Sequence, residues 1–146
     1  MKLDVPFNLN FSLCCGQVFR WKKIDTRWYG VVGDHVLKIS QRDNVLDFEG
    51  ADEEFIKNYF GLNDDLTEIK RCIDKDPYVA KALKKFEGLR IVRQNPWECL
   101  ISFICATYKS IAAIELMLSK ISLKFGEKKK FYDMDISEEH LKTHWG

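Results

Sequence analysis

The sequence predicts an α+β fold, in which an antiparallel β-sheet with helices is followed by a group of helices. Three observations support this class. Apolar residues alternate with polar ones from Phe7 to Leu13, which is the period of a half-buried strand. Short β-branched and aromatic runs separated by turn residues continue as far as Phe48. After Gly50 the apolar period becomes helical.

The first half of the chain predicts an antiparallel meander. Its first strand is expected over Phe7–Leu13, and four further strands are expected over Val18–Lys22, Trp28–Val32, Val36–Ser40 and Val45–Phe48. The segments between the later runs are Asp25-Thr26-Arg27, Gly33-Asp34 and Arg42-Asp43-Asn44. Residues of these types favour tight turns, and strands joined by tight turns pair antiparallel.

Three helices are expected after the strands. The first carries apolar residues on one face, at Phe55, Ile56, Tyr59 and Phe60. Asp65 is suited to cap the second, with Glu68 completing a capping box. Asp76-Pro77 predicts the start of the third helix, which is expected to stop near Gly88. Leu89–Val92 is expected to return as a further strand.

A second group of helices follows. Asn95-Pro96-Trp97-Glu98 predicts a helix start, and the wide apolar arc of that helix is typical of a central helix. Ser110 is suited to cap the next helix, whose apolar stripe is Ile114, Leu118, Ile121 and Phe125. A last helix is expected from Ser137 to Trp145.

These elements predict two domains, a sheet domain over residues 1–92 and the start of a helical domain over residues 93–146. The last predicted helix reaches Trp145 without a cap, and only two complete helices precede it. We therefore expect the chain to be a fragment of a longer protein. The alternative is a naturally short protein whose tail packs on itself.

Composition excludes little. The net charge is +1, but residues 1–70 carry 9 Lys/Arg against 12 Asp/Glu, a net −3, while residues 71–146 carry 14 against 10, a net +4. This weak bias favours the second half as the phosphate-facing side.

No signal peptide or membrane span is predicted, so a cytoplasmic or nuclear location is expected. The five cysteines form no C-x-x-C pair, and Cys99 and Cys105 are expected to pack in the core.

Motifs for common enzyme classes do not occur in the chain, which has no P-loop, H-E-x-x-H or G-x-S-x-G pattern. His140 and His144 have the i, i+4 spacing of metal ligands but lack a third ligand, so no metal or other cofactor is expected.

The basic run 128–130 is either a phosphate contact or a solvated loop. Lys109, beside Tyr108 in the junction between two helices, either touches nucleic acid or is an ordinary exposed turn residue.

Two longer segments carry a resemblance. Residues 7–21, FNLNFSLCCGQVFRW, resemble the F-x-L-x-x-x-L-x-x-G-Q-x-F-R-W opening of 8-oxoguanine DNA glycosylases. Residues 93–105, RQNPWECLISFIC, resemble the stretch with which the same family begins its helical domain. The spacing between the two motifs also fits, as do the segments Trp28–Val31 and Phe86–Arg90.

The resemblance implies a TATA-binding-protein-like sheet domain followed by the first helices of a helix-hairpin-helix glycosylase domain. It also implies a protein that acts on duplex DNA containing 8-oxoguanine, flips the damaged base out and displaces it with a lysine amine. The sequence has no obvious apolar repeat that demands a partner, so a monomer is expected. Gly16 matches the glycine whose main-chain carbonyl accepts the N7 hydrogen of 8-oxoguanine. The alternative interpretation is that Gly16 is a glycine required only by a tight turn. Gly16 can have both roles at once. The family's catalytic lysine and aspartate lie beyond Gly146, so no catalytic residue is expected within this chain.

The chain departs from the family after the second motif. Many members follow it with polar residues and an asparagine that probes the base opposite the lesion, whereas this chain has Ala106, Thr107, Tyr108, Lys109 and Ser110. The family arginine a few residues later is matched by Ala113. Tyr108 and Lys109 are therefore the expected DNA contacts, with Tyr108 suited to stack in the gap left by a flipped base.

Two other functions remain open. The first is a non-catalytic DNA-binding or interaction module that keeps the glycosylase fold, which an intact gene ending near Gly146 would distinguish. The second is a thiol enzyme that uses Cys14, Cys15 or Cys105 with a histidine, although the sequence offers no positioned base.

Overall fold

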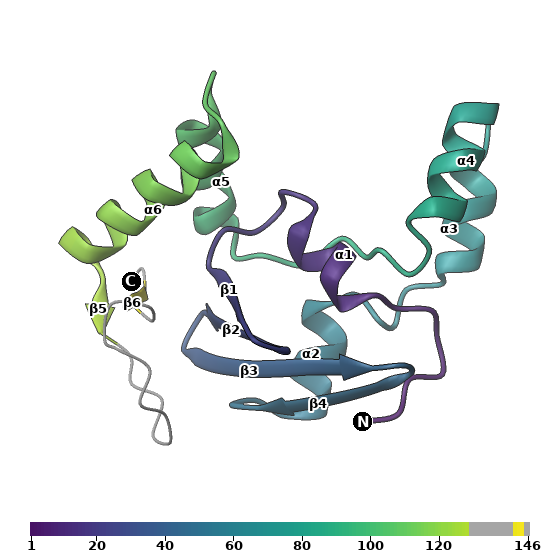
Figure 1. Cartoon of the computed structure of the whole chain (residues 1–146), viewed down its shortest axis with the longest axis horizontal. Helices are drawn as coiled ribbons and strands as arrows, with labels where there is room; N and C mark the ends of the chain where they lie inside the picture. Colours follow the sequence, from purple (N-terminus) through teal and green to yellow (C-terminus); the bar gives the residue numbers. More distant parts are fainter. Residues whose placement is uncertain (129–141, 145–146) are drawn as a thin grey trace.

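The meander predicted from the first half of the sequence is present as a four-stranded antiparallel sheet (Figure 1). The computed structural model describes residues 1–128 and 142–144. The sheet consists of β1 (Trp21–Ile24), β2 (Arg27–Val32), β3 (His35–Arg42) and β4 (Val45–Glu49), in that order. The helices are α1 (Leu9–Cys14), α2 (Glu53–Tyr59), α3 (Leu66–Ile73), α4 (Pro77–Lys85), α5 (Pro96–Ala106) and α6 (Ile111–Phe125).

Tight turns join the strands, as the turn residues predict. The pairs at the ends of the hairpins are Ile24 with Arg27, Val32 with His35, and Arg42 with Val45. Each turn contains a residue with positive φ, namely Asp25 (53°), Gly33 (55°) and Asp43 (53°). Hairpins this short require left-handed backbone, which Gly and Asp adopt at low cost. Strand β1 differs slightly from expectation, because the strand predicted from Val18 begins at Trp21.

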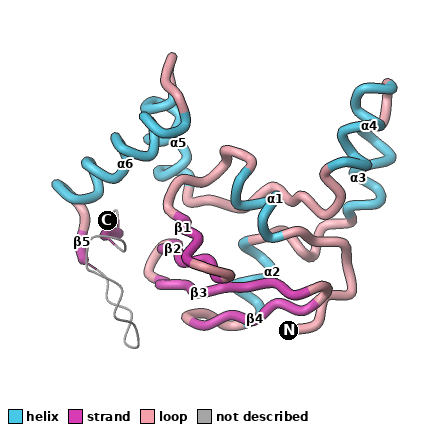
Figure 2. Tube along the Cα trace, in the orientation of Figure 1, coloured by secondary structure: helices cyan, strands magenta, loops and turns pink. Residues whose placement is uncertain are grey.

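The core lies between the sheet and the helices α1 and α2. Its most deeply buried apolar side chains come from β3, β4, α1, α2 and the residue after α2: Leu37, Ile39, Leu46, Leu9, Ile56 and Phe60. The ring of Phe7 packs edge-on against that of Phe60, with centroids 5.1 Å apart. In Figure 2, α3 with α4 and α5 with α6 form two further helix pairs, which extend from this body on either side of α1.

The strand expected over Phe7–Leu13 is wrong, because this segment contains helix α1. The side chain of Asn8 caps the helix by accepting the Phe11 N–H at 2.9 Å. Leu9 and Leu13 are four residues apart, so they share one face of a helix as well as one face of a strand. Local alternation therefore suits both structures. Burial of Leu9 and Leu13 in the core, together with the cap, favours the helix.

Caps place the next helices where the sequence predicts them. Asp65 accepts the N–H groups of Thr67 and Glu68, and Asp76 accepts those of Tyr78 and Val79. Three residues after α4 ends, Gly88 has φ +81° and lies against the backbone of residues 7 and 8. An added Cβ there would lie 2.8 Å from the Asn8 nitrogen, so this close approach requires glycine.

The strand expected over Leu89–Val92 is also wrong. The segment is extended, but its N–H groups bond to partners outside any strand ladder. Arg90 N–H donates to Ser12 Oγ at 3.0 Å, and Val92 N–H donates to Gln17 Oε1 at 3.0 Å. Because side chains accept these two backbone N–H groups, the segment needs no neighbouring strand to bond to them.

Helices α5 and α6 form as predicted, and their caps Asn95 and Ser110 are confirmed. Their burial differs from expectation. Ser102 is the one buried residue of α5, Cys99 is exposed, and Cys105 is only half-buried. The expected core position of Cys99 is therefore wrong, because the described elements cover the apolar arc of α5 only in part and leave Leu100, Phe103 and Ile104 exposed. On α6, Ile114 and Leu118 are buried while Phe125 is exposed.

The helix expected from Ser137 to Trp145 is wrong over residues 142–144. These residues form β6 (Lys142–His144), which pairs antiparallel with β5 (Glu127–Lys128). The remainder of that expectation, together with Lys129, Lys130 and His140, lies outside the described residues. Among the described helices, none combines the length and the apolar character needed to cross a bilayer.

Candidate functional site

A pocket of about 500 Å³ lies between the loop after α1, the extended segment before α5, and one side of α5. The loop contributes Gly16, Gln17 and Phe19, and the extended segment contributes Ile91, Val92 and Gln94. The wall from α5 and its C-terminal end consists of Pro96, Cys99, Ser102, Phe103 and Ala106. The two sequence motifs that carry the family resemblance therefore meet in one cavity.

Gly16 lies at the rim of this pocket, in the turn that ends α1. Its φ is +85°, a left-handed conformation that glycine adopts without strain. No atom lies within 4 Å of the Cβ that another residue would add, so conformation rather than space favours glycine. Within residues 1–128 and 142–144, the Gly16 carbonyl accepts no hydrogen bond from the protein. It is therefore an acceptor without a protein donor among these residues, at a glycine that lines the pocket.

Gln17 joins the loop to the opposite wall of the pocket. Its side-chain amide accepts the Val92 N–H at 3.0 Å and donates to the Arg90 carbonyl at 3.1 Å. The side chain of Gln94 donates to the Gln17 carbonyl at 2.6 Å. Neither glutamine was singled out from the sequence, although each lies within one of the two quoted motifs.

An ion pair joins the same loop to α5. The Arg20 guanidinium lies 3.6 Å from the Glu98 carboxylate, and their side chains are 11% and 15% exposed. Burial lowers the pKa of Arg20, while the Glu98 carboxylate acts in the opposite direction. Arg20 belongs to the first motif and Glu98 to the second, so the pair fixes the loop relative to the helix.

The buried side chain of Arg90 holds the extended segment before α5 in place through hydrogen bonds to carbonyl groups. Its side chain is 3% exposed and donates to the carbonyls of Gly61 and Asp64 at 2.8 Å each. It also donates to the Pro6 carbonyl through two nitrogens. A forked guanidinium satisfies several carbonyls at once, which an ammonium group does not.

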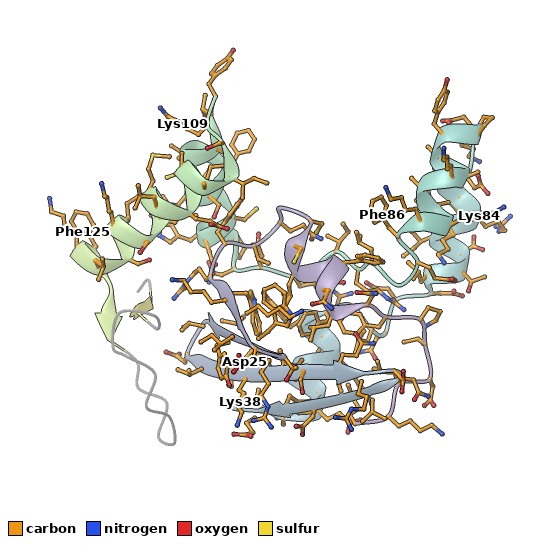
Figure 3. The ribbon with its side chains drawn as sticks, viewed as in Figure 1. Asp25, Lys38, Lys84, Phe86, Lys109 and Phe125 are labelled. Carbon is orange, nitrogen blue, oxygen red and sulfur yellow. The ribbon has the colours of Figure 1, made fainter. Side chains whose placement is uncertain are left out.

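Tyr108 and Lys109 lie in the turn between α5 and α6 and do not line the pocket. Tyr108 has φ +54° and is fully exposed, at 102%. The Lys109 N–H donates to the carbonyl of Ala106, a pocket residue, at 3.2 Å. Figure 3 shows Lys109 at the outer end of the α5–α6 pair, away from Lys38 on the sheet. The turn therefore presents an aromatic ring and a cation next to the pocket, in an uncommon backbone conformation.

The thiols do not form a catalytic pair with a histidine in the part of the chain that the structure describes. Cys15 bonds to Ser12 and Gln17, and Cys72 bonds to Glu68. His35 lies on β3, where its Nδ1 is 3.1 Å from the Gly50 carbonyl and its ring packs on Phe55. Among the same residues, no group of three or more His, Cys, Asp or Glu is arranged to hold a metal ion.

A sequence family and several proteins are similar to this chain. The family described as 8-oxoguanine DNA glycosylase, N-terminal domain, matches residues 2–100. An N-glycosylase/DNA lyase of Arabidopsis thaliana is 31% identical over 118 residues, covering 73% of this chain and 32% of that protein. An N-glycosylase/DNA lyase of Saccharomyces cerevisiae is 29% identical over 137 residues, covering 78% and 35%. The chain thus spans about a third of the length of these curated relatives.

A solved structure extends the likeness to three dimensions. The 8-oxoguanine glycosylase/lyase of Clostridium acetobutylicum, in complex with double-stranded DNA containing cytosine opposite 8-oxoguanine, has a TM-score of 0.83 and 26% identity. The match covers 99% of this chain and 52% of that protein. It therefore includes the residues of the sheet, of the pocket and of helices α5 and α6.

Proposed function

Because the chain belongs to the 8-oxoguanine DNA glycosylase family through its match to the N-terminal domain, we propose that it serves base excision repair by recognising 8-oxoguanine in duplex DNA. The observation that carries this proposal is the pocket in which the two family motifs meet around Gly16. Its wall combines apolar side chains with a few polar groups, as small-ligand sites do. A base inside a duplex does not reach such a pocket, so the damaged nucleotide is flipped out of the stack.

Gly16 supplies the discrimination in this proposal. 8-Oxoguanine carries a hydrogen on N7, which donates to the Gly16 carbonyl, whereas the N7 of guanine presents a lone pair to the same acceptor. A bound base covers this exposed carbonyl, and the difference between a satisfied and an unsatisfied buried acceptor is about 1–3 kcal/mol. The unbonded carbonyl and the left-handed glycine at the rim support this role.

Tyr108 and Lys109 are proposed to contact the DNA beside the flipped nucleotide. A fully exposed tyrosine next to the pocket is suited to stack where the base has left the duplex. The Lys109 ammonium is suited to a backbone phosphate, a contact that positions the protein without reading sequence.

The whole protein is proposed to act as a glycosylase and lyase, with residues 1–92 as the sheet domain and residues 93–146 as the beginning of the helical domain. The Arabidopsis and yeast relatives are named N-glycosylase/DNA lyase, which supports this activity. Its nucleophile is proposed to lie outside these 146 residues, so this chain alone does not release the base. The proposed place of action is the cytoplasm or, in a eukaryote, the nucleus.

A binding experiment tests the proposal. The 146-residue chain is titrated with duplexes that contain either one 8-oxoguanine or guanine at the same position, and base release is assayed in parallel. We expect tighter binding to the lesion duplex and no base release. Equal or absent binding favours the alternative of a non-catalytic module, and base release by the chain contradicts the placement of the nucleophile.

Matched variants locate the site. Gly16→Ala forces a side chain into a positive-φ position and is expected to reduce the lesion preference. Gly33→Ala is its control, because Gly33 also has positive φ and open surroundings but lies in the β2–β3 turn. Lys109→Glu is expected to weaken binding to both duplexes, with Lys84→Glu on α4 as the control of equal charge change.

A further inference from the structure

Two glutamine side chains bind the main chain of another segment in the same way. Gln17 Oε1 accepts the Val92 N–H at 3.0 Å while its Nε2 donates to the Arg90 carbonyl at 3.1 Å. Gln41 Oε1 accepts the Leu9 N–H at 2.7 Å while its Nε2 donates to the Phe7 carbonyl at 2.8 Å. Each amide thus bonds to the carbonyl of one residue and the N–H of the second residue after it. A neighbouring parallel strand would bond to the same two groups.

Only one of the two glutamines belongs to the pocket. Gln17 and its target Val92 both line it, whereas Gln41 fastens residues 7–9 near the start of α1 and does not line it. The main chain of Gln17 is held as well, because Gln94 donates to the Gln17 carbonyl at 2.6 Å. Gln17 Nε2 also lies 2.7 Å from the Cys15 sulfur. The residues on either side of Gly16 are therefore joined through the Gln17 amide.

Little in Gly16 itself restrains the position of its carbonyl. It is exposed, carries no side chain and has the backbone freedom of glycine. A hydrogen bond weakens steeply when its distance or angle departs from the optimum. If the loop moves, the Gly16 carbonyl can turn away from the N7 lone pair of guanine and so avoid the repulsion. It is also less well aligned with the N7 hydrogen of 8-oxoguanine. A mobile carbonyl therefore discriminates poorly between the two bases.

We propose that Gln17 is the positioning residue that holds the Gly16 carbonyl at the pocket, and that its amide sets how strongly 8-oxoguanine is preferred over guanine. This inference rests on the proposed function for the identity of the ligand. It goes further by assigning selectivity to a residue whose side chain is bonded to the protein itself. Recognition then depends on preorganisation of the acceptor as well as on its chemistry.

The test compares Gln17→Met with Gln41→Met in the 146-residue chain. Methionine has a similar length to glutamine but lacks the amide, and the control removes the same two kinds of hydrogen bond at a position outside the pocket. Two quantities are measured for each variant: the ratio of affinities for 8-oxoguanine and guanine duplexes, and amide hydrogen exchange of residues 15–18 by NMR. Urea unfolding of both variants records their loss of stability.

For Gln17→Met we expect the affinity ratio to fall about fivefold to tenfold, and exchange at residues 15–18 to accelerate. Gln41→Met is expected to lose a comparable amount of stability with an unchanged ratio and unchanged exchange in that loop. Gln17→Glu retains the acceptor for Val92 but not the donor to Arg90, so it is expected to give an intermediate ratio. An unchanged ratio in Gln17→Met, or an equal fall in Gln41→Met, overturns the assignment.

The two proposals fail in distinguishable ways. If the unmodified chain shows no preference for the lesion, the proposed function fails for this chain and the link between Gln17 and selectivity fails with it. The exchange rates then still decide the positioning role. Faster exchange at residues 15–18 in Gln17→Met alone supports it, and unchanged exchange overturns it.

Discussion

The indole of Trp21 leaves no room for a side chain at position 30. Gly30 lies directly opposite Trp21 in the β1–β2 pair, and a Cβ added to it would lie 2.4 Å from Trp21 Cδ2. The indole is fixed in turn, because its Nε1 donates to the Tyr59 hydroxyl at 3.0 Å. Glycine is required here by a close approach between strands rather than by backbone conformation.

Gly30→Ala is therefore expected to destabilise the fold by about 1–3 kcal/mol, the usual cost of overpacking a core. The measurement is the free energy of unfolding in urea. The same substitution in a Trp21→Leu background is expected to cost less, since the ring that the methyl group meets is gone. Equal costs in both backgrounds would contradict the steric explanation.

Tyr59 makes the fold sensitive to alkaline pH. It is 5% exposed, and burial raises its pKa above the ordinary value, with the Trp21 hydrogen bond acting in the opposite direction. In the unfolded chain tyrosine ionises near pH 10. The contribution of Tyr59 is thus fully present below about pH 10 and is lost as the pH rises above it, because only the unfolded chain releases the proton there.

Tyr59→Phe separates this effect from the titration of the lysines. At neutral pH the variant is expected to be about 1 kcal/mol less stable, because the Trp21 N–H loses its acceptor. Between pH 9 and 11 its stability is expected to fall less steeply than that of the unmodified chain. Urea unfolding at several pH values checks this, and identical slopes would contradict it.

Between elements, the ion pair of Arg20 with Glu98 holds the loop after α1 against α5. Both side chains are largely buried, where the two opposite charges compensate one another. The pair lies next to the pocket wall, since Phe19 and Cys99 are pocket residues. Its loss affects the geometry of the site as well as stability.

A double-mutant cycle with Arg20→Met and Glu98→Gln measures this coupling. Either single substitution is expected to cost about 3 kcal/mol, because it leaves the other polar group buried without its charge partner. The double variant is expected to cost clearly less than the sum of the two. Additive costs in urea unfolding would show that the pair does not join the loop to α5.

Across the whole molecule, apolar exposure is concentrated on the α5–α6 pair. Helix α5 exposes Phe103 (76%), and α6 exposes Leu116, Leu123 and Phe125. Figure 3 shows Phe125 at the end of α6 distant from Lys109, so the exposed apolar residues extend along the pair. This many exposed apolar side chains on one helix pair is more than the singly scattered apolar residues of a monomeric domain.

The folded chain is accordingly expected to bind the dye ANS without denaturant. The double variant Leu116→Gln, Leu123→Gln is expected to lower the ANS fluorescence by about half or more while changing the stability by less than about 0.5 kcal/mol, since both residues are exposed. Val45→Gln removes an exposed apolar residue of β4, outside the α5–α6 pair, and is the control. Equal effects of the two changes would contradict a continuous surface.

The sequence by itself determined the elements whose signals are local. The residues Asp25, Gly33 and Asp43 predicted the hairpins because tight turns need left-handed backbone, and Asp65, Asp76, Asn95 and Ser110 predicted helix starts because their side chains bind free N–H groups. The two long motifs predicted the family, which the match over residues 2–100 confirms, and Gly16 is the site residue that they lead us to propose.

Only the tertiary structure decided the rest. Residues 7–13 satisfy the periods of both strand and helix, and contacts with the core selected the helix. Leu89–Val92 is extended without being a strand, because distant residues Ser12 and Gln17 bind its N–H groups. The position of Gly16 at a pocket likewise depends on Gln17 and on the Arg20–Glu98 pair, which act over more than seventy residues of sequence. Local patterns do not encode such long-range contacts, since their partners meet only when the chain has folded.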